Sequence, residues 1–168
     1  MQALHAARMG HSTQLWARDA DTVYSINTVH TNAMLEGHAL PESLCATLDL
    51  AAVVEHSELL LLVVPSPYIE SVLAPVAQLL SPRHIVVSCS KGILQDSLET
   101  VDEVLLRLLP AALHSRLAYL SGPSFAAEVA DGKPTCVTVA SEVGLQCGLG
   151  QVLVGSAAHG FQELQRPE

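Results

Sequence analysis

The sequence has little charge, and most of that charge is of one sign. Only 15% of its 168 residues are charged and 49% are hydrophobic, which excludes a disordered or fibrous chain. The 17 acidic residues outnumber the 8 basic ones, so the formal net charge is −9. An acidic surface repels nucleic acid and anionic lipid, so we expect neither as a general partner, although a small anion can still bind locally.

Several motifs that mark metal or catalytic sites are absent. The histidines show no H-E-x-x-H or other paired spacing, so we expect no metal, and no G-x-S-x-G or Walker loop occurs. Cysteines stand at Cys45, Cys89, Cys136 and Cys147, without metal-finger spacing or a compact disulfide pattern. Reduced thiols in an intracellular protein are the expected state.

The sequence also lacks a long hydrophobic run. The most apolar stretch, residues 59–64, is too short to cross a bilayer, and the first dozen residues contain no continuous apolar segment typical of a targeting signal. We therefore expect no membrane span and an intracellular, cytoplasmic protein, with an organelle as the alternative.

What is present is an alternation of short apolar runs with longer helical patterns. It predicts an α/β fold with a mostly parallel, Rossmann-like sheet and helices on both faces. The expected strands are 13–17, 45–48, 59–64, 84–88, 117–120 and 135–140, and the expected helices are 1–9, 19–29, 49–56, 67–80, 97–109 and 124–130. The continuous apolar run 59–64 predicts a strand in the sheet interior, covered on both faces. Residues 142–168 show weak periodicity, and their fold is not predicted.

Ligands of such sheets collect beyond the carboxyl ends of the strands. Arg18 and Asp19 follow the first expected strand. A carboxylate at this position suits a ribose 2′-hydroxyl, and a guanidinium suits a ribose 2′-phosphate. Because both groups are present, the pair does not decide which form of the ribose is bound. A helix cap beside a surface arginine is the alternative interpretation.

Three further segments follow expected strands. Pro65 ends the run 59–64 and turns the chain away from the sheet. Lys91, one of two lysines in the chain, precedes Gly92 and suits an anionic or carbonyl ligand, unless it is a solvated surface lysine. Ser124, at an expected helix start after Gly122, suits phosphate or is a simple helix cap. We expect Lys91, Gly122 and Ser124 to converge at one end of the sheet and to open into one concavity.

The order of these segments resembles the soluble, nicotinamide-dependent glycerol-3-phosphate dehydrogenases over roughly residues 2–141. The matching segments are Leu15-Trp16-Ala17-Arg18-Asp19, residues 32–41, Val63-Val64-Pro65-Ser66, Ser90-Lys91-Gly92-Ile93, Ser121-Gly122-Pro123-Ser124-Phe125-Ala126-Ala127-Glu128-Val129 and Pro134-Thr135. The Lys-Gly-Ile and Ser-Gly-Pro-Ser-Phe segments together are specific to that family.

The resemblance implies hydride transfer between NAD or NADP and the pair dihydroxyacetone phosphate and sn-glycerol 3-phosphate. It places four residues at the cofactor and three at the small phosphate substrate. The cofactor set is Arg18, Asp19, Lys91 and Ala126, and the substrate set is Lys91, Gly122 and Ser124. It is also compatible with a homodimer of the complete enzyme.

Two departures from the family pattern stand out. The family has a central strand and a Gly-x-Gly-x-x-Gly turn ahead of the helix that here starts at Met1, and neither occurs in this sequence. We expect a gap there, a direct pairing of 13–17 with 59–64, or a replacement strand from the tail. The family's acid/base lysine, in a Gly-Gly-Ala-Leu-Lys-Asn segment, is also absent, and the position of Lys133 does not match it.

The sequence therefore predicts an incomplete Rossmann-like domain at 1–141 and a divergent tail at 142–168, with no catalytic residue and no activity of this chain alone. Two alternatives remain open. One is a non-catalytic remnant that binds an anion or a partner, and the other is another Rossmann-type hydroxyacid or polyol dehydrogenase.

Overall fold

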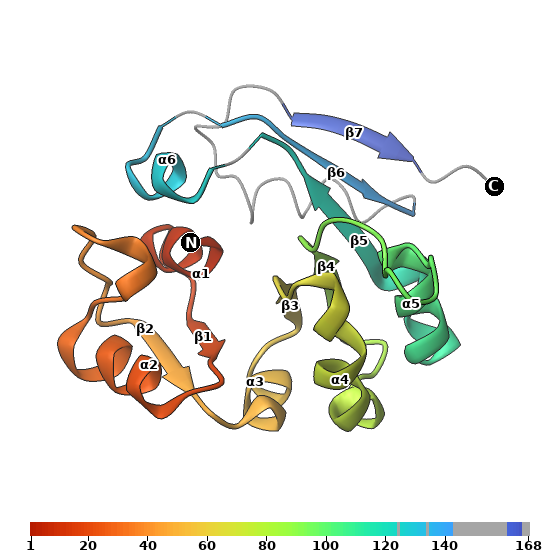
Figure 1. Ribbon diagram of the computed structural model, residues 1–168, viewed down its shortest axis with the longest axis horizontal. Helices are drawn as coiled ribbons and strands as arrows, with labels where there is room; N and C mark the ends of the chain where they lie inside the picture. Colours follow the sequence, from red (N-terminus) through yellow and green to blue (C-terminus); the bar gives the residue numbers. More distant parts are fainter. Residues whose placement is uncertain (124, 134, 143–160, 166–168) are drawn as a thin grey trace.

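The computed structural model describes residues 1–123, 125–133 and 135–142, and the backbone of 161–165. Strands and helices alternate along the chain (Figure 1). The strands are β1 (Thr13–Trp16), β2 (Leu44–Thr47), β3 (Leu59–Leu62), β4 (Ile85–Ser88), β5 (Leu117–Ser121), β6 (Val137–Ser141) and β7 (Phe161–Gln165). The α-helices are α1 (Gln2–Arg8), α2 (Ala20–Tyr24), α3 (Leu50–His56), α4 (Ile69–Leu73), α5 (Val101–Leu108) and α6 (Ala126–Ala130). A π-helical segment η1 (Ser25–Val29) and the 3-10 segments η2 (Ala33–Leu35), η3 (Ser66–Tyr68), η4 (Ala74–Leu79) and η5 (Ala111–Arg116) complete the elements.

The strands form two separate sheets. β1 and β2 pair in parallel, and a five-stranded sheet has the order β3-β4-β5-β6-β7. Within that sheet only the β5–β6 pair is antiparallel, so the expected α/β fold with a mostly parallel sheet is confirmed. β7 extends the sheet beyond β6, in a part of the chain for which the sequence predicts no fold.

The expected position of the apolar run 59–64 is wrong. β3 is an edge strand of the five-stranded sheet, and its residues Leu59, Leu60 and Leu61 are only half-buried. Its open edge faces the space that separates it from β1. No strand of the described residues lies between β3 and β1, so of the three outcomes expected at this place the described part of the chain shows the gap.

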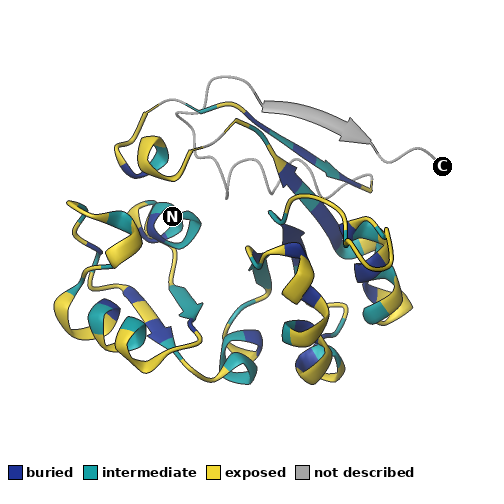
Figure 2. Ribbon diagram, in the orientation of Figure 1, coloured by how far each residue is buried: buried dark blue, intermediate teal, exposed yellow. Residues whose placement is uncertain are grey.

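Two apolar layers flank the larger sheet, because successive residues of a strand point to opposite faces. Val86 of β4 packs in a cluster with residues of α4, α5 and η5. Its neighbour Val87 packs instead with Ala118 and Val139 of the adjoining strands. Figure 2 shows the buried residues concentrated along these strands and the inward sides of the helices. The smaller sheet has its own cluster, in which Leu4 of α1 and Ile26 of η1 are almost fully buried.

Capping side chains set several helix starts. The Asp19 carboxylate accepts a hydrogen bond from the Thr22 amide at 2.7 Å, and Asp49 accepts from the amides of Ala51 and Ala52, as the sequence predicts. Thr100 and Glu103 form a reciprocal capping box at the start of α5.

Two predicted helices differ from the observed ones. The expected helix 97–109 begins at Val101, because the preceding turn holds Leu98 in the left-handed region with φ +58°. The expected helix 67–80 is divided into η3, α4 and η4. Pro75, near the start of η4, has no amide hydrogen to continue an α-helical ladder.

Two polar side chains join elements that lie far apart in the sequence. Asn27 of η1 pairs with the backbone of Ala46, accepting from its amide at 2.7 Å and donating to its carbonyl at 2.9 Å. This closes the outer edge of β2. The fully buried His84 accepts from the Ser81 amide at 2.9 Å, which leaves Nε2 as the donor to the Val54 carbonyl at 3.1 Å. That bond ties the end of α3 to the start of β4.

The Arg107 guanidinium on α5 donates hydrogen bonds to the carboxylate oxygens of Glu70 and Glu99, with nitrogen–oxygen distances of 3.0–3.1 Å. The guanidinium lowers the pKa of both below the usual 4.5. Carboxylates with lowered pKa stabilise the fold above their unfolded-state pKa, and this stabilisation is lost as the pH falls through the lower folded-state value.

We therefore expect Arg107→Ala to lower the melting temperature modestly at about pH 6, because exposed ion pairs contribute little. The difference from the unmodified chain should shrink as the pH falls below about 4.5. Arg116→Ala is the control, since Arg116 donates to the Pro82 carbonyl and contacts no carboxylate of the residues that the structure describes. A difference that stays constant from neutral to acidic pH would contradict the ion-pair explanation.

Candidate functional site

The candidate residues follow the carboxyl ends of strands. Lys91 comes after β4 and Gly122 directly after β5, and these parallel neighbours present their carboxyl ends at the same edge of the sheet. Arg18 follows β1 of the smaller sheet and is exposed, as is Lys91. Ser124 lies outside the described residues, so the predicted convergence of Lys91, Gly122 and Ser124 stays a prediction.

The turns after β3 and β4 are fastened to each other. The Ser90 hydroxyl donates a hydrogen bond to the Val64 carbonyl at 2.6 Å. Gly92 has φ +95°, a left-handed conformation that favours glycine, and a Cβ there would lie 3.7 Å from Ser66 Oγ. Lys91 is thus held beside the Pro65–Ser66 turn, although some 25 residues separate them in the sequence.

Gly122 is required by packing. A Cβ at this position would lie 2.6 Å from the Cys136 carbonyl oxygen and 3.0 Å from the Val137 Cα, so β5 and β6 approach too closely here for any side chain. The close approach of the two strands is a sufficient reason for glycine at this position.

The segment after Gly122 differs in detail from the expectation. The helix α6 begins at Ala126, two residues later than predicted, and Phe125 occupies the cap position without a side-chain hydrogen bond. Ala126 is exposed, and so is Phe125, which retains 69% of its accessible surface. A helix of five residues has too few aligned peptides to create a strong anion site by itself.

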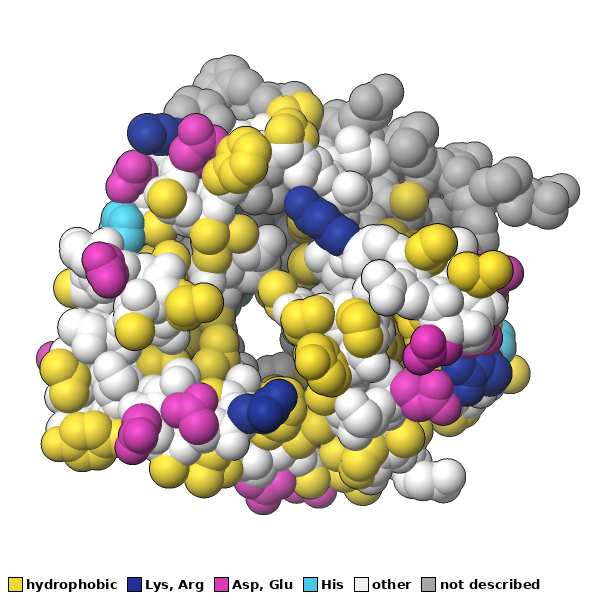
Figure 3. Space-filling model, viewed as in Figure 1, with side chains coloured by type: hydrophobic (Ala, Val, Ile, Leu, Met, Phe, Trp, Pro, Cys, Tyr) yellow, Lys and Arg dark blue, Asp and Glu magenta, His cyan; other side chains and the backbone are white. Residues whose placement is uncertain are grey.

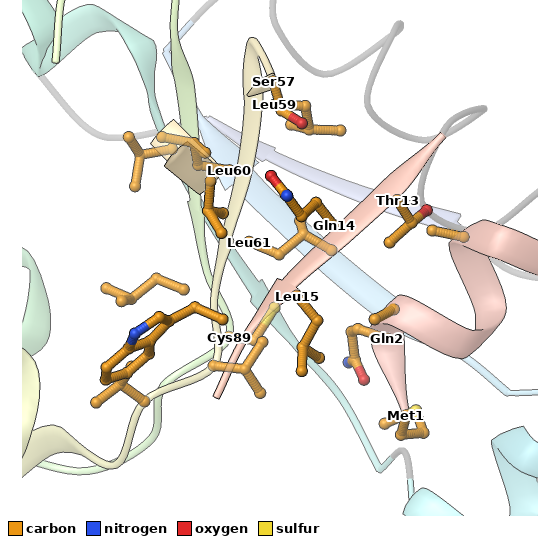
Figure 4. A pocket seen from close by; sticks show the side chains of 18 of the residues that line it. Met1, Gln2, Thr13, Gln14, Leu15, Ser57, Leu59, Leu60, Leu61 and Cys89 are labelled. Atoms are coloured by element: carbon orange, nitrogen blue, oxygen red, sulfur yellow. The ribbon is translucent and has the colours of Figure 1, made fainter. Parts of the chain in front are cut away.

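A cavity of about 1080 Å³ occupies the space between β1 and β3. Its lining is mostly apolar, and Arg18 and Lys133 contribute charged groups to it, whereas Lys91 and Gly122 are not among the lining residues. Figure 3 shows the opening in the middle of the molecule, with basic side chains on two sides of it. The close view in Figure 4 shows side chains of β1 and β3 facing each other across the cavity.

Cys89, also on the cavity lining, has an unreactive thiol. Burial raises its pKa to about 11, and the charge of Lys91 offsets only part of this effect. At about pH 8 we expect iodoacetamide to alkylate Cys89 roughly a hundredfold more slowly than a thiol with ordinary pKa. The exposed thiols of Cys45 and Cys136 provide the comparison within the same sample.

Peptide mapping by mass spectrometry measures each rate separately. Unfolding in urea should remove the difference among the three cysteines. Equal rates in the folded protein would contradict the buried position of Cys89.

Residues 2–145 match the family model described as the N-terminus of NAD-dependent glycerol-3-phosphate dehydrogenase. The chain belongs to this family. Two bacterial relatives are named glycerol-3-phosphate dehydrogenase [NAD(P)+]. The one from Parvibaculum lavamentivorans is 44% identical over 138 residues, which cover 82% of this chain and 40% of the relative. The one from a Chelativorans species is 40% identical over 143 residues, covering 84% of this chain and 43% of the relative.

Solved structures of the same family share the fold. The glycerol-3-phosphate dehydrogenase of Coxiella burnetii aligns with a TM-score of 0.82 at 29% identity, over 99% of this chain and 50% of that one. The enzyme of Dunaliella salina aligns with a TM-score of 0.80 at 18% identity, over 97% of this chain and 30% of that one. The chain spans about two fifths of the length of the curated relatives it matches.

The family resemblance drawn from the motifs is thereby confirmed, and the fold is that of the family's Rossmann-type domain. Among the described residues, no helix has the length and apolarity needed to cross a membrane. Sequence reasoning missed Gln14, which lines the cavity, because a lone glutamine in a short strand carries no pattern that would distinguish it.

Proposed function

We propose that this chain supplies part of the nucleotide-binding half of a glycerol-3-phosphate dehydrogenase. The complete activity is hydride transfer between NAD or NADP and the pair dihydroxyacetone phosphate and sn-glycerol 3-phosphate. The observation that carries the proposal is the family match over residues 2–145, on a fold whose strand ends hold the candidate residues. An intracellular, cytoplasmic site of action and a homodimer of the complete enzyme belong to the same proposal.

The residues at two ends of the cofactor site fit a dinucleotide. At the adenosine end, the Asp19 carboxylate already caps α2, and its hydrogen bond with Thr22 lowers its pKa. The exposed Arg18 side chain makes no hydrogen bond to the described residues, so its donors can bind a ribose hydroxyl or a 2′-phosphate. At the nicotinamide end, Lys91 lies beside the Ser66 turn and Ala126 is exposed.

The middle of the site does not fit the pyrophosphate of a dinucleotide. Between β1 and β3 the described residues leave a cavity, and no glycine-rich turn is present there to hold the pyrophosphate. The cofactor supplies a hydride carrier when it is bound. For this chain we propose only binding roles: Arg18 at the ribose, Lys91 at the nicotinamide and substrate, and Gly122 and Ser124 at the substrate.

Titration with NADH and NADPH, followed by amide NMR, tests the proposal. We expect weak, saturable shifts at the amides of Arg18, Lys91 and Gly92, because the outer contacts are present and the pyrophosphate turn is not. Arg18→Ala should weaken binding at least fivefold, since a guanidinium-to-phosphate or -hydroxyl bond contributes about 1–3 kcal/mol. Arg83→Ala is the matched control, because Arg83 precedes β4 and lies at the opposite end of that strand.

Two outcomes separate the alternatives. Shifts with inorganic phosphate but with neither nucleotide would favour a non-catalytic anion-binding remnant. The absence of shifts at Arg18 and Lys91, or equal losses in the two arginine variants, would contradict the proposed cofactor site. Another hydroxyacid dehydrogenase is the second alternative, but the D-mandelate dehydrogenase structures are only 15–16% identical and share the fold alone.

A further inference from the structure

The helix α6 connects β5 with β6 of the larger sheet, but its end packs with the smaller sheet. Its last residue, Ala130, is buried in the cluster that contains Leu4 of α1 and Leu44 of β2. The helix also contacts η2, and Figure 1 shows it beside α1. We call residues 125–133, all of which the structure describes, the α6 segment. This segment joins the two sheets at a second place besides α3.

Arg8 of α1 attaches the end of the α6 segment. Its Nη1 donates a hydrogen bond to the Ala130 carbonyl at 2.6 Å, across 122 positions of the sequence. The last carbonyls of a helix have no partner within the helix, so an outside donor is needed to satisfy them. A guanidinium is a charged donor, and such hydrogen bonds are stronger than those between neutral groups. Arg8 therefore contributes a directional contact where apolar packing alone would not fix the helix.

A second contact lies one residue further along the segment. His38, which follows η2, has its Nε2 atom 3.4 Å from Asp131 Oδ1. The other carboxylate oxygen of Asp131 lies 3.3 Å from Lys133 Nζ, but Lys133 belongs to the same segment. The contact with His38 can therefore hold the α6 segment on the smaller sheet, whereas the contact with Lys133 cannot.

The first half of the α6 segment is exposed. Solvent reaches Phe125, Ala126, Ala127 and Glu128, and Phe125 caps the helix without a side-chain hydrogen bond. A helix of five residues is not stable in water through its own hydrogen bonds. The position of Ala126, a candidate cofactor residue, thus depends on the contacts at the other end of the segment.

We propose that Arg8 and His38 are positioning residues, which hold the α6 segment on the smaller sheet and so place Ala126 at the nicotinamide end of the cofactor site. Each acts through the end of the segment, at Ala130 or Asp131. The positioning role rests on the proposed binding of NADH or NADPH. The attachment itself is measurable without a ligand.

Amide hydrogen exchange followed by NMR tests the attachment in the chain without ligand. The amides of Asp131 and Gly132 donate to carbonyls within the α6 segment and report on its opening. Arg8 is exposed, and Arg8→Met keeps an unbranched side chain but removes its donors. We expect both amides to exchange about tenfold faster in this variant, because a hydrogen bond from a charged donor is lost. Arg8→Lys should restore part of the protection, since it keeps a charged donor.

Two control variants remove similar contacts. Arg116→Met removes a guanidinium-to-carbonyl hydrogen bond, with Pro82, that does not involve the α6 segment. Lys133→Met removes the other partner of Asp131. We expect neither variant to change the exchange of the two reporter amides.

His38→Ala tests the second contact and should raise exchange at the same two amides. The Val104 amide, which donates to the Thr100 carbonyl at the start of α5, reports on the larger sheet's helices. Its exchange rate should not follow the reporter amides. If Arg8→Met and His38→Ala accelerate Val104 by the same factor, the chain opens as a whole and the local attachment is refuted.

Binding of AMP and NADH separates positioning from general support of the site. AMP has only the adenosine end, so Arg8→Met should leave its dissociation constant, measured at the Arg18 amide, unchanged. NADH also reaches the nicotinamide end and should bind about fivefold more weakly, because only molecules with the α6 segment in place present Ala126 to it. Equal losses for both ligands would mean that Arg8 supports the smaller sheet in general, which would overturn the positioning role.

The two measurements distinguish failure of this inference from failure of the proposed function. Unchanged exchange of the reporter amides in Arg8→Met and in His38→Ala would refute the inference, whatever the nucleotides do. If neither nucleotide shifts any amide of the unmodified chain, the proposed function is wrong, and so is the placement of Ala126 at a cofactor. The exchange rates would still decide whether Arg8 and His38 hold the segment.

Discussion

The purified chain should not oxidise NADH or NADPH in the presence of dihydroxyacetone phosphate. General acid–base catalysis typically contributes about 10²–10⁴-fold, and the lysine that supplies it in the family has no counterpart in this sequence. Lys133 is paired with Asp131 at 3.3 Å, and Lys91 lies beside the Ser66 turn, where the proposal gives it a binding role. The missing pyrophosphate turn reduces cofactor binding as well.

The measurement follows nucleotide absorbance over a wide range of substrate concentration. The glycerol-3-phosphate dehydrogenase of Coxiella burnetii, of which this chain covers 50%, is the positive control. Turnover of this chain that saturates with substrate and disappears in Lys91→Ala would refute the prediction. It would show that Lys91 moves a proton as well as binding ligands.

Gly122→Ala should lower the free energy of unfolding by about 3 kcal/mol, at the upper end of what an overpacked site costs. The added methyl group would lie 2.6 Å from the Cys136 carbonyl oxygen, which belongs to the backbone and has no rotamer to change. The strands β5 and β6 would have to separate, at the expense of hydrogen bonds in their ladder. Urea unfolding monitored by circular dichroism measures the change.

Ser121→Ala is the matched control, because Ser121 is exposed at the adjacent position and its change should have little effect. The two roles considered for Gly122 lead to different results. If Gly122→Ala is as stable as the unmodified chain but loses phosphate binding, the residue acts on the substrate and the packing explanation is wrong. A stability loss of the expected size supports the packing role.

The motifs identified the family because they combine residues that must stand in a fixed order at strand ends. Lys91-Gly92 and the segment around Gly122 lie where the topology places ligands, and the family comparison agrees with that interpretation. The family match does not assign roles to single residues. Arg18, Asp19, Lys91, Ala126, Gly122 and Ser124 remain proposals, and Ser124 lies outside the described residues.

The order and type of most elements follow from the amino-acid sequence alone, because they depend on residues within a few positions of each other. Asp49 caps a helix through amides two and three residues away, and Thr100 and Glu103 cap each other across one turn. The apolar run 59–64 likewise specifies a strand, whatever stands beside it.

The neighbours of each strand, in contrast, are fixed by contacts between distant segments that form when the chain folds. β3 became an edge strand, Asn27 closed the outer edge of β2, and Gly122 was fixed by the approach of Cys136. Each of these depends on segments that meet from distant parts of the chain. A strand's own residues encode its apolar character but not the partner that satisfies its backbone, so the sequence gives the gap between β1 and β3 as one of three outcomes without deciding among them.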